Sequence, residues 1–253
     1  MLSEYTPEEL ATGLDAVALE LLSRAGVDAP PVDAFAVARQ LGITVARDDQ
    51  QRGRARYVRL QGRPTAGRPT ILLRGDPRPE RCHWAVAHEI GEHAAYRVFA
   101  RWGIDAREID PRAREEVANH LAGRLLLPTA WFEADAVTNG WDLMAIKARY
   151  ATASHELIAR RMLECRPPVI VTIFDQDAVY FRRSNVPGRV PPLSAAEREC
   201  RRAVHDGNWP QRACDGPRTI QGWPVHEPEW KREILRTGVE ICEVDACWGC
   251  GMG

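Results

Sequence analysis

The chain has 253 residues, of which 45% are hydrophobic and 27% are charged, the composition of a globular protein with one or two domains. The formal net charge of −1 gives the chain no overall basic field that would indicate nucleic-acid binding. No apolar run is long enough for a membrane helix and the N-terminus lacks a signal-peptide pattern, so no membrane partner and a cytoplasmic location are expected. Seven cysteines without regular spacing favour reduced thiols or metal ligands over a disulfide framework.

Two helices are predicted at the start of the chain. Residues 6–9, Thr-Pro-Glu-Glu, have the pattern of a helix start: the threonine can cap, the proline suits the first turn, and the second glutamate completes a capping box. Apolar residues then recur at helical spacing as far as Leu22. A second, shorter helix is predicted from Val32 to Leu41 because a glycine follows directly.

Three short strands are predicted next, at residues 43–45, 55–58 and 70–73, with turns rich in glycine and proline between them. We expect them to form a small antiparallel sheet. Arginine is abundant between residues 52 and 81, a pattern that could give a phosphate-facing surface. An arginine-rich solvated face is the favoured interpretation, and direct nucleic-acid binding stays open.

Helical patterns dominate the following part of the chain. Helices are predicted at residues 79–99 and 111–128 and, as two shorter elements, within 129–164. Residues 143–162 have the periodicity of a helix-turn-helix unit. A packing role for this unit is favoured over DNA reading because the chain lacks a dominant basic helix.

The composition changes at residues 166–168, Arg-Pro-Pro, where we place a domain boundary. Residues 169–174 and 178–181 predict a β-hairpin. The remainder is rich in proline, glycine, tryptophan and cysteine. The sequence therefore predicts an α+β protein, with a mainly helical domain at 1–165 followed by a small β-rich domain at 166–253.

Residues 87–93, Ala-His-Glu-Ile-Gly-Glu-His, carry a metal-ligand pattern within a predicted helix. Two ligands four residues apart on a helix face one metal ion, and the glutamate after the first ligand can act as a general base. His88 is the expected first ligand and Glu89 the expected base. Where the usual pattern has its second histidine this chain has Glu92, and a histidine follows one residue later, at His93.

Either Glu92 or His93 could supply the second ligand. Around an α-helix, Glu92 lies about 40° from His88, whereas His93 lies about 140° away. Carboxylate oxygen is an acceptable zinc ligand, so the helix geometry favours Glu92. His93 stays the alternative, because a π-bulge that inserts one residue into the turn would bring it round to the metal.

A third ligand should come from a second helix that packs across the first. Glu115 and Asn119 share one face at a spacing of four residues, and the small Ala118 would let the helices approach closely. Glu116 and His120 form the neighbouring pair at the same spacing and are the alternative.

These two segments resemble the ImmA/IrrE family of metallo-endopeptidases. The family pattern Ala-His-Glu-x-x-His is matched from Ala87, except that Glu92 stands at the second histidine. The second pattern, Glu-x-x-Ala-Asn-x-Phe-Ala-x-x-Leu-Leu-x-Pro, is matched by residues 115–128, with Leu121 at the phenylalanine. The resemblance covers residues 10–165 and implies a zincin-like fold.

By this resemblance, His88 and Glu115 are zinc ligands and Glu89 is the general base. Mn²⁺ or Fe²⁺ is the less favoured metal, considered because a His/Glu/Glu set is rich in carboxylates. The resemblance implies a cytoplasmic endopeptidase that cleaves a helix-turn-helix (XRE-like) repressor and so derepresses stress-response or mobile-element genes. The alternative hypothesis is a non-catalytic sensor, or a toxin–antitoxin-like binding partner, that keeps the fold.

The C-terminal cysteines suggest a second, structural zinc site. Cys242, Cys247 and Cys250 could chelate zinc together with a fourth ligand from the same domain. The candidates for that ligand are Cys200, Cys214, His205 and His226. A single Cys-x-x-Cys pair is a weak signal, so cysteines without a specific role are the favoured interpretation. Four tryptophans are expected in the core of this domain: Trp209, Trp223, Trp230 and Trp248.

Overall fold

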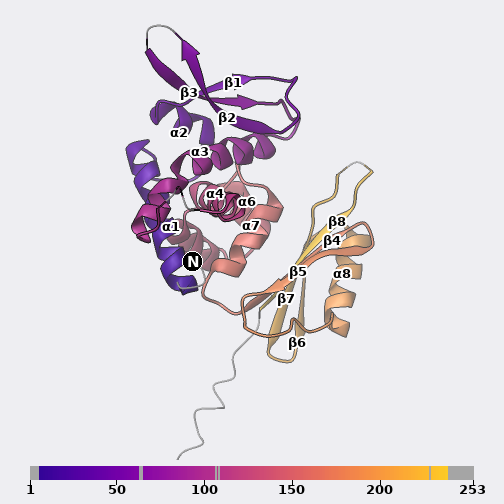
Figure 1. Cartoon of the computed structure of the whole chain (residues 1–253). Helices are drawn as coiled ribbons and strands as arrows, with labels where there is room; N and C mark the ends of the chain where they lie inside the picture. Colours follow the sequence, from indigo (N-terminus) through magenta and orange to yellow (C-terminus); the bar gives the residue numbers. More distant parts are fainter. Residues whose placement is uncertain (1–5, 63–64, 106, 108, 228, 239–253) are drawn as a thin grey trace, which may run out of the picture. The chain divides into compact units, whose positions relative to one another are not determined.

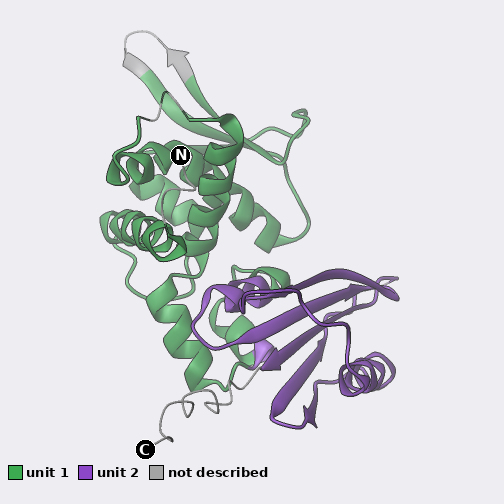
Figure 2. Ribbon diagram, turned by 60° about the horizontal axis from the view of Figure 1, so that its bottom comes forward, with its two compact units in different colours: residues 1–141, 145–157 green, residues 142–144, 158–253 purple. Residues whose placement is uncertain are grey.

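The computed structural model describes residues 6–62, 65–105, 107, 109–227 and 229–238 (Figure 1). The chain forms two compact units, residues 1–141 with 145–157 and residues 142–144 with 158–253 (Figure 2). Helices and two small sheets together confirm the α+β class. The expected domain boundary between residues 165 and 166 stays a prediction. In the described part of the chain, no helix is long and apolar enough to cross a membrane.

The first unit is mainly helical. Its helices are α1 (Pro7–Arg24), α2 (Ala34–Gln40), α3 (Pro79–Arg101), α4 (Pro111–Leu126) and α5 (Thr129–Thr138). Two short helices, α6 (Leu143–Arg149) and α7 (His155–Arg161), contain residues of both units. The start of α1 is the predicted capping box, because Glu9 N donates to Thr6 Oγ1 and the Glu9 carboxylate accepts from Thr6 N.

The sheet of this unit has the strand order β1-β3-β2, formed by β1 (Thr44–Arg47), β2 (Ala55–Gly62) and β3 (Thr65–Leu73). Strands β2 and β3 pair antiparallel, but β1 and β3 pair parallel. The expectation of an antiparallel sheet was therefore wrong for β1. The hairpin β2–β3 places β3 in the middle of the sheet, so β1 pairs with the strand that runs in its own direction. Strand β2 lies at an edge.

Helices α3 and α4 form the centre of the unit and lie in direct contact. Their buried apolar side chains include Val86, Ile90, Ala94 and Val98 on α3, and Val117, Leu121 and Leu125 on α4. At Gly91 a Cβ atom would lie 2.6 Å from the carbonyl oxygen of Ala118. Glycine at this position therefore allows α3 to approach the backbone of α4.

The second unit contains a five-stranded antiparallel sheet with the order β5-β4-β8-β7-β6. The elements are β4 (Val169–Asp175), β5 (Ala178–Ser184), α8 (Ala195–Gly207), β6 (Gln211–Asp215), β7 (Arg218–Pro224) and β8 (Arg232–Gly238), preceded by the short 3-10 helix η3 (Met162–Glu164). The predicted hairpin is β4–β5, and the expectation of a β-rich second part is confirmed. Helix α8, which was not predicted, packs against β6, β7 and β8.

The tryptophans of this unit have different environments. Trp223 on β7 is buried, as expected. Trp209 and Trp230 are 61% and 44% exposed, so their predicted place in the core was wrong. Both lie in turns: Trp209 follows the left-handed residue that ends α8, and Trp230 closes a turn between β7 and β8. Trp248 lies outside the described residues.

Candidate metal centre

Three side chains from α3 and α4 meet at one point. His88 and Glu92 lie one turn apart on α3, and Glu115 lies on the first half of α4. One possible ligand atom from each lies within 4.8 Å of those of the other two. His88 Nε2 and Glu115 Oε2 are 3.5 Å apart. The structure therefore brings together His88 and Glu115, which the family resemblance implies as ligands, and Glu92, which helix geometry favours as the second ligand.

Neighbouring polar groups hold both carboxylates. Asn119 Nδ2 donates to Glu115 Oε1 at 3.3 Å, which leaves Oε2 on the side of His88. Arg114 Nε contacts Glu92 Oε2 at 2.9 Å, and the same guanidinium donates to the Glu92 carbonyl. Arg114 was not singled out in the sequence. Arg114 precedes Glu115 on α4 and contacts Glu92 on α3, so it links the two helices beside the candidate ligands.

The three residues fit a divalent cation. Zinc–nitrogen and zinc–oxygen bonds of 2.0–2.2 Å put two tetrahedral ligand atoms about 3.3 Å apart, close to the 3.5 Å between His88 Nε2 and Glu115 Oε2. Neutral imidazole and two carboxylates are donors that zinc accepts. Glu115 is an exposed side chain, so the group is accessible from solvent. The arrangement can hold a metal ion, and the donor types do not decide which one.

Glu89 lies beside this group in a different environment. Its side chain is buried, and its Oε2 accepts a hydrogen bond of 2.6 Å from the backbone N–H of Tyr57 on β2. Burial raises the pKa of Glu89, and the negative charges of Glu92 and Glu115 act in the same direction, against the Tyr57 hydrogen bond and His88. A carboxyl with a raised pKa is suited to accept and return a proton near neutral pH.

His93 does not join the group. Its ring stacks on the ring of Tyr57, with centroids 4.9 Å apart and planes 28° apart. Helix α3 is continuous α-helix from Pro79 to Arg101, without the π-bulge that would turn His93 toward His88. Burial lowers the pKa of His93, and nearby arginines, Arg59 first among them, lower it further.

The remaining candidate ligands lie elsewhere. Glu116 and His120 are exposed on α4 and are not part of the three-residue group. Cys242, Cys247 and Cys250 lie outside the described residues, so their predicted site stays a prediction. Their candidate partners in the second unit have separate environments. Cys200 is buried, Cys214 is exposed, and His205 and His226 contact Glu233.

Two carboxylates and an imidazole from crossing helices, beside a buried glutamate, define a site of the metallopeptidase type. Residues 38–163 match the sequence profile of peptidase family M78, described as the IrrE N-terminal-like domain. The chain therefore contains a domain of this metallopeptidase family, and the resemblance to ImmA/IrrE proteins is confirmed.

A solved structure of a Mycobacterium tuberculosis transcriptional regulator is similar to this chain. The two share 17% sequence identity with a TM-score of 0.62, over 90% of this chain and 75% of that one. At this identity the likeness shows the fold alone. No curated protein matches the sequence.

Proposed function

We propose that this protein is a zinc-dependent endopeptidase in which His88, Glu92 and Glu115 bind the metal and Glu89 is the general base. One observation carries the proposal. Three donor side chains, two on α3 and one on α4, meet next to Glu89, a buried carboxylate on α3. The match to a peptidase family supports it independently. Zinc is preferred to Mn²⁺ or Fe²⁺ because three protein ligands with an open position are typical of catalytic zinc.

Glu89 would move the proton in the reaction. A zinc ion supplies Lewis acidity, which lowers the pKa of water and polarises a carbonyl group. The N–H of Tyr57 holds Glu89 Oε2 and so fixes the carboxylate, while Oε1 accepts no hydrogen bond from the described residues. Oε1 can then take a proton from the attacking water and deliver it to the leaving amine.

The edge of the sheet offers a place for an extended peptide. Strand β2 is an edge strand, and the N–H of Tyr57 points to Glu89 rather than to a neighbouring strand. The outer edge of β2 therefore borders the catalytic carboxylate. Extended peptides add to such edges through main-chain hydrogen bonds. This geometry supports cleavage within a chain that can present an extended segment.

The substrate class follows from the family resemblance. We propose a helix-turn-helix (XRE-like) repressor as the substrate, so that cleavage derepresses stress-response or mobile-element genes. We also propose a cytoplasmic location, because the cysteines of the described residues are free thiols, as expected in a reducing compartment.

The test uses the full-length protein and the helix-turn-helix repressor encoded beside it. The purified protein should carry one zinc ion per chain and cleave the repressor. Glu89→Gln should abolish cleavage and retain zinc, whereas Glu116→Gln, an exposed glutamate on α4, should behave as the wild type. Stable binding of the repressor without cleavage by the zinc-loaded wild type would contradict the proposal and favour the non-catalytic binding partner.

A further inference from the structure

Helix α8 of the second unit has two distinct faces. Cys200 and Val204 are buried, and with residues of β7 and β8 they form part of the core of this unit. The basic side chains lie at the spacing i, i+3, i+4 and i+7, which places them on one face of the helix: Arg198, Arg201, Arg202 and His205. One face of α8 therefore fixes the helix to the sheet, and another is cationic.

This cationic face lines a cavity of about 360 Å³. The volume lies in the range of sites for small molecules, about 300–1,000 Å³. The cavity is amphipathic, since apolar side chains from the sheet and the loop before α8 complete its wall: Phe174, Val179 and Leu193. Asp177 is the acidic residue of the lining.

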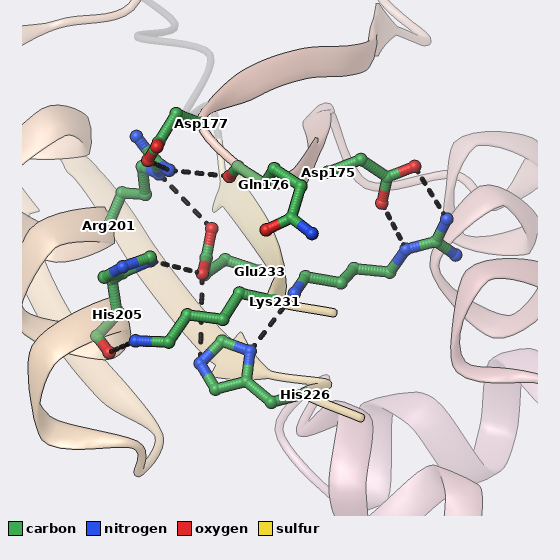
Figure 3. A network of polar contacts seen from close by, with 9 residues as sticks. Asp175, Gln176, Asp177, Arg201, His205, His226, Lys231 and Glu233 are labelled. Carbon is green, nitrogen blue, oxygen red and sulfur yellow. Dashed lines mark hydrogen bonds and ion pairs between the residues drawn. The ribbon is translucent and has the colours of Figure 1, made fainter. Parts of the chain in front are cut away.

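Two carboxylates, the buried Glu233 and the exposed Asp177, and one backbone carbonyl contact Arg201 (Figure 3). Its Nη2 donates to Asp177 Oδ1 at 3.0 Å and to the Gln176 carbonyl at 2.9 Å, and its Nε contacts Glu233 Oε2 at 3.3 Å. The guanidinium lies 4.7 Å from the centre of the Phe174 ring. Arg201 thus forms a fixed part of the wall and does not have to be ordered when a ligand binds.

His205 is held by the same buried carboxylate. The side chain of Glu233 is fully buried, and its Oε1 lies 2.8 Å from His205 Nδ1 (Figure 3). His226 Nε2 lies 3.8 Å from that oxygen, so this cluster has two imidazoles and a carboxylate. The guanidinium of Arg201 contacts the same carboxylate, so three basic side chains surround Glu233.

The charge of the lining is positive. Arg198 donates to the backbone carbonyl of Leu193 and has no acidic partner in the part of the chain that the structure describes. Arg202 pairs with the exposed Glu199, which is not part of the lining. The lining therefore contains three arginines and one carboxylate, Asp177, which is already paired with Arg201; Arg198 and Arg202 have no acidic partner within the lining. Arginine beside an apolar wall is suited to a ligand with an acidic group and an apolar part.

We propose that this cavity binds a small organic anion. Its acidic group would contact Arg198 and Arg202, and its apolar part would pack against Val179 and Leu193. The site lies entirely in the second unit and does not depend on the proposed peptidase function.

The test uses 8-anilinonaphthalene-1-sulfonate, an aromatic sulfonate, titrated into the full-length protein by calorimetry. We expect saturable binding with one site per chain. The double variant Arg198→Gln/Arg202→Gln should bind at least about tenfold more weakly. Arg212→Gln, an exposed arginine on β6 outside the lining, should bind as the wild type.

A second ligand separates the role of charge from that of the apolar wall. N-phenyl-1-naphthylamine has the same rings without the sulfonate, and we expect it to bind at least about tenfold more weakly than the sulfonate. Equal affinity of the two ligands, equal affinity of the double variant and the wild type, or binding that does not saturate would each overturn the proposal. Circular dichroism of the variants confirms that they are folded.

Discussion

Replacing Gly91 by alanine should damage the metal centre although the new methyl group touches none of its ligands. The added Cβ would lie 2.6 Å from the carbonyl oxygen of Ala118 and 3.2 Å from its Cα. A carbon–oxygen contact is normally about 3.3 Å or longer, so α3 and α4 would have to separate locally by about 0.7 Å. The atoms in contact belong to the backbone of α4, so no side-chain rotation can relieve the overlap.

The size of the effect follows from two opposing contributions. Overpacking in a core costs about 1–3 kcal/mol, whereas alanine stabilises a helix by about 1 kcal/mol relative to glycine. The net loss of stability is therefore up to about 2 kcal/mol. The same separation moves Glu115 away from His88, since each lies on one of the two helices. Disturbing the groups that orient metal ligands lowers metal affinity by about tenfold or more, and we expect a loss of that size here.

Thermal unfolding without metal and a zinc competition titration measure the two effects. Gly123→Ala is the matched control, because Gly123 lies inside α4 and a Cβ there would meet no atom within 4 Å. That variant should keep its zinc affinity and gain up to about 1 kcal/mol of stability. A Gly91→Ala variant that is as stable as Gly123→Ala and binds zinc as tightly as the wild type would contradict this prediction.

Two other predictions concern the second ligand and a buried ion pair. Glu92→Ala should weaken zinc binding at least about tenfold in a competition titration, whereas His93→Ala should leave it unchanged; the opposite result would restore the π-bulge hypothesis. Burial raises the pKa of Glu197, but hydrogen bonds from Arg182 and Thr237 outweigh it and lower this pKa below 4.5. Its folded pKa is then below its unfolded pKa, so its stabilisation is present at neutral pH and is lost as the pH falls through the folded value. Urea unfolding should show Glu197→Gln less stable than the wild type at pH 7, with a smaller difference below pH 4.5; an equal difference at both pH values would contradict this.

Local patterns were sufficient where the structure is determined locally. The capping box at Thr6 predicted the start of α1, and the residues of the β4–β5 hairpin were recognised from two apolar runs and a short turn. Helix α8 carries the same kind of signal, a capping box between Ser194 and Glu197. The sequence does not predict this helix clearly, because the composition of residues 166–253, rich in proline and glycine, favours turns and strands.

Contacts between distant segments could not be predicted from spacing. The parallel pairing of β1 with β3 depends on which strand takes the middle of the sheet, and nothing in the composition of β1 encodes it. The hydrogen bond from Tyr57 to Glu89 joins residues 32 positions apart. Within α3, by contrast, spacing was sufficient. Helix geometry fixes the directions of His88 and Glu92, the two residues of α3 that meet Glu115.

The central claim is that His88, Glu92 and Glu115 form one metal site. Anomalous diffraction at the zinc absorption edge, from crystals of the zinc-loaded protein, tests it most directly. We expect an anomalous peak within bonding distance of all three side chains, with His93 still stacked on Tyr57. A peak bonded to His93 in place of Glu92, or no peak between these side chains in the zinc-loaded protein, would contradict the account.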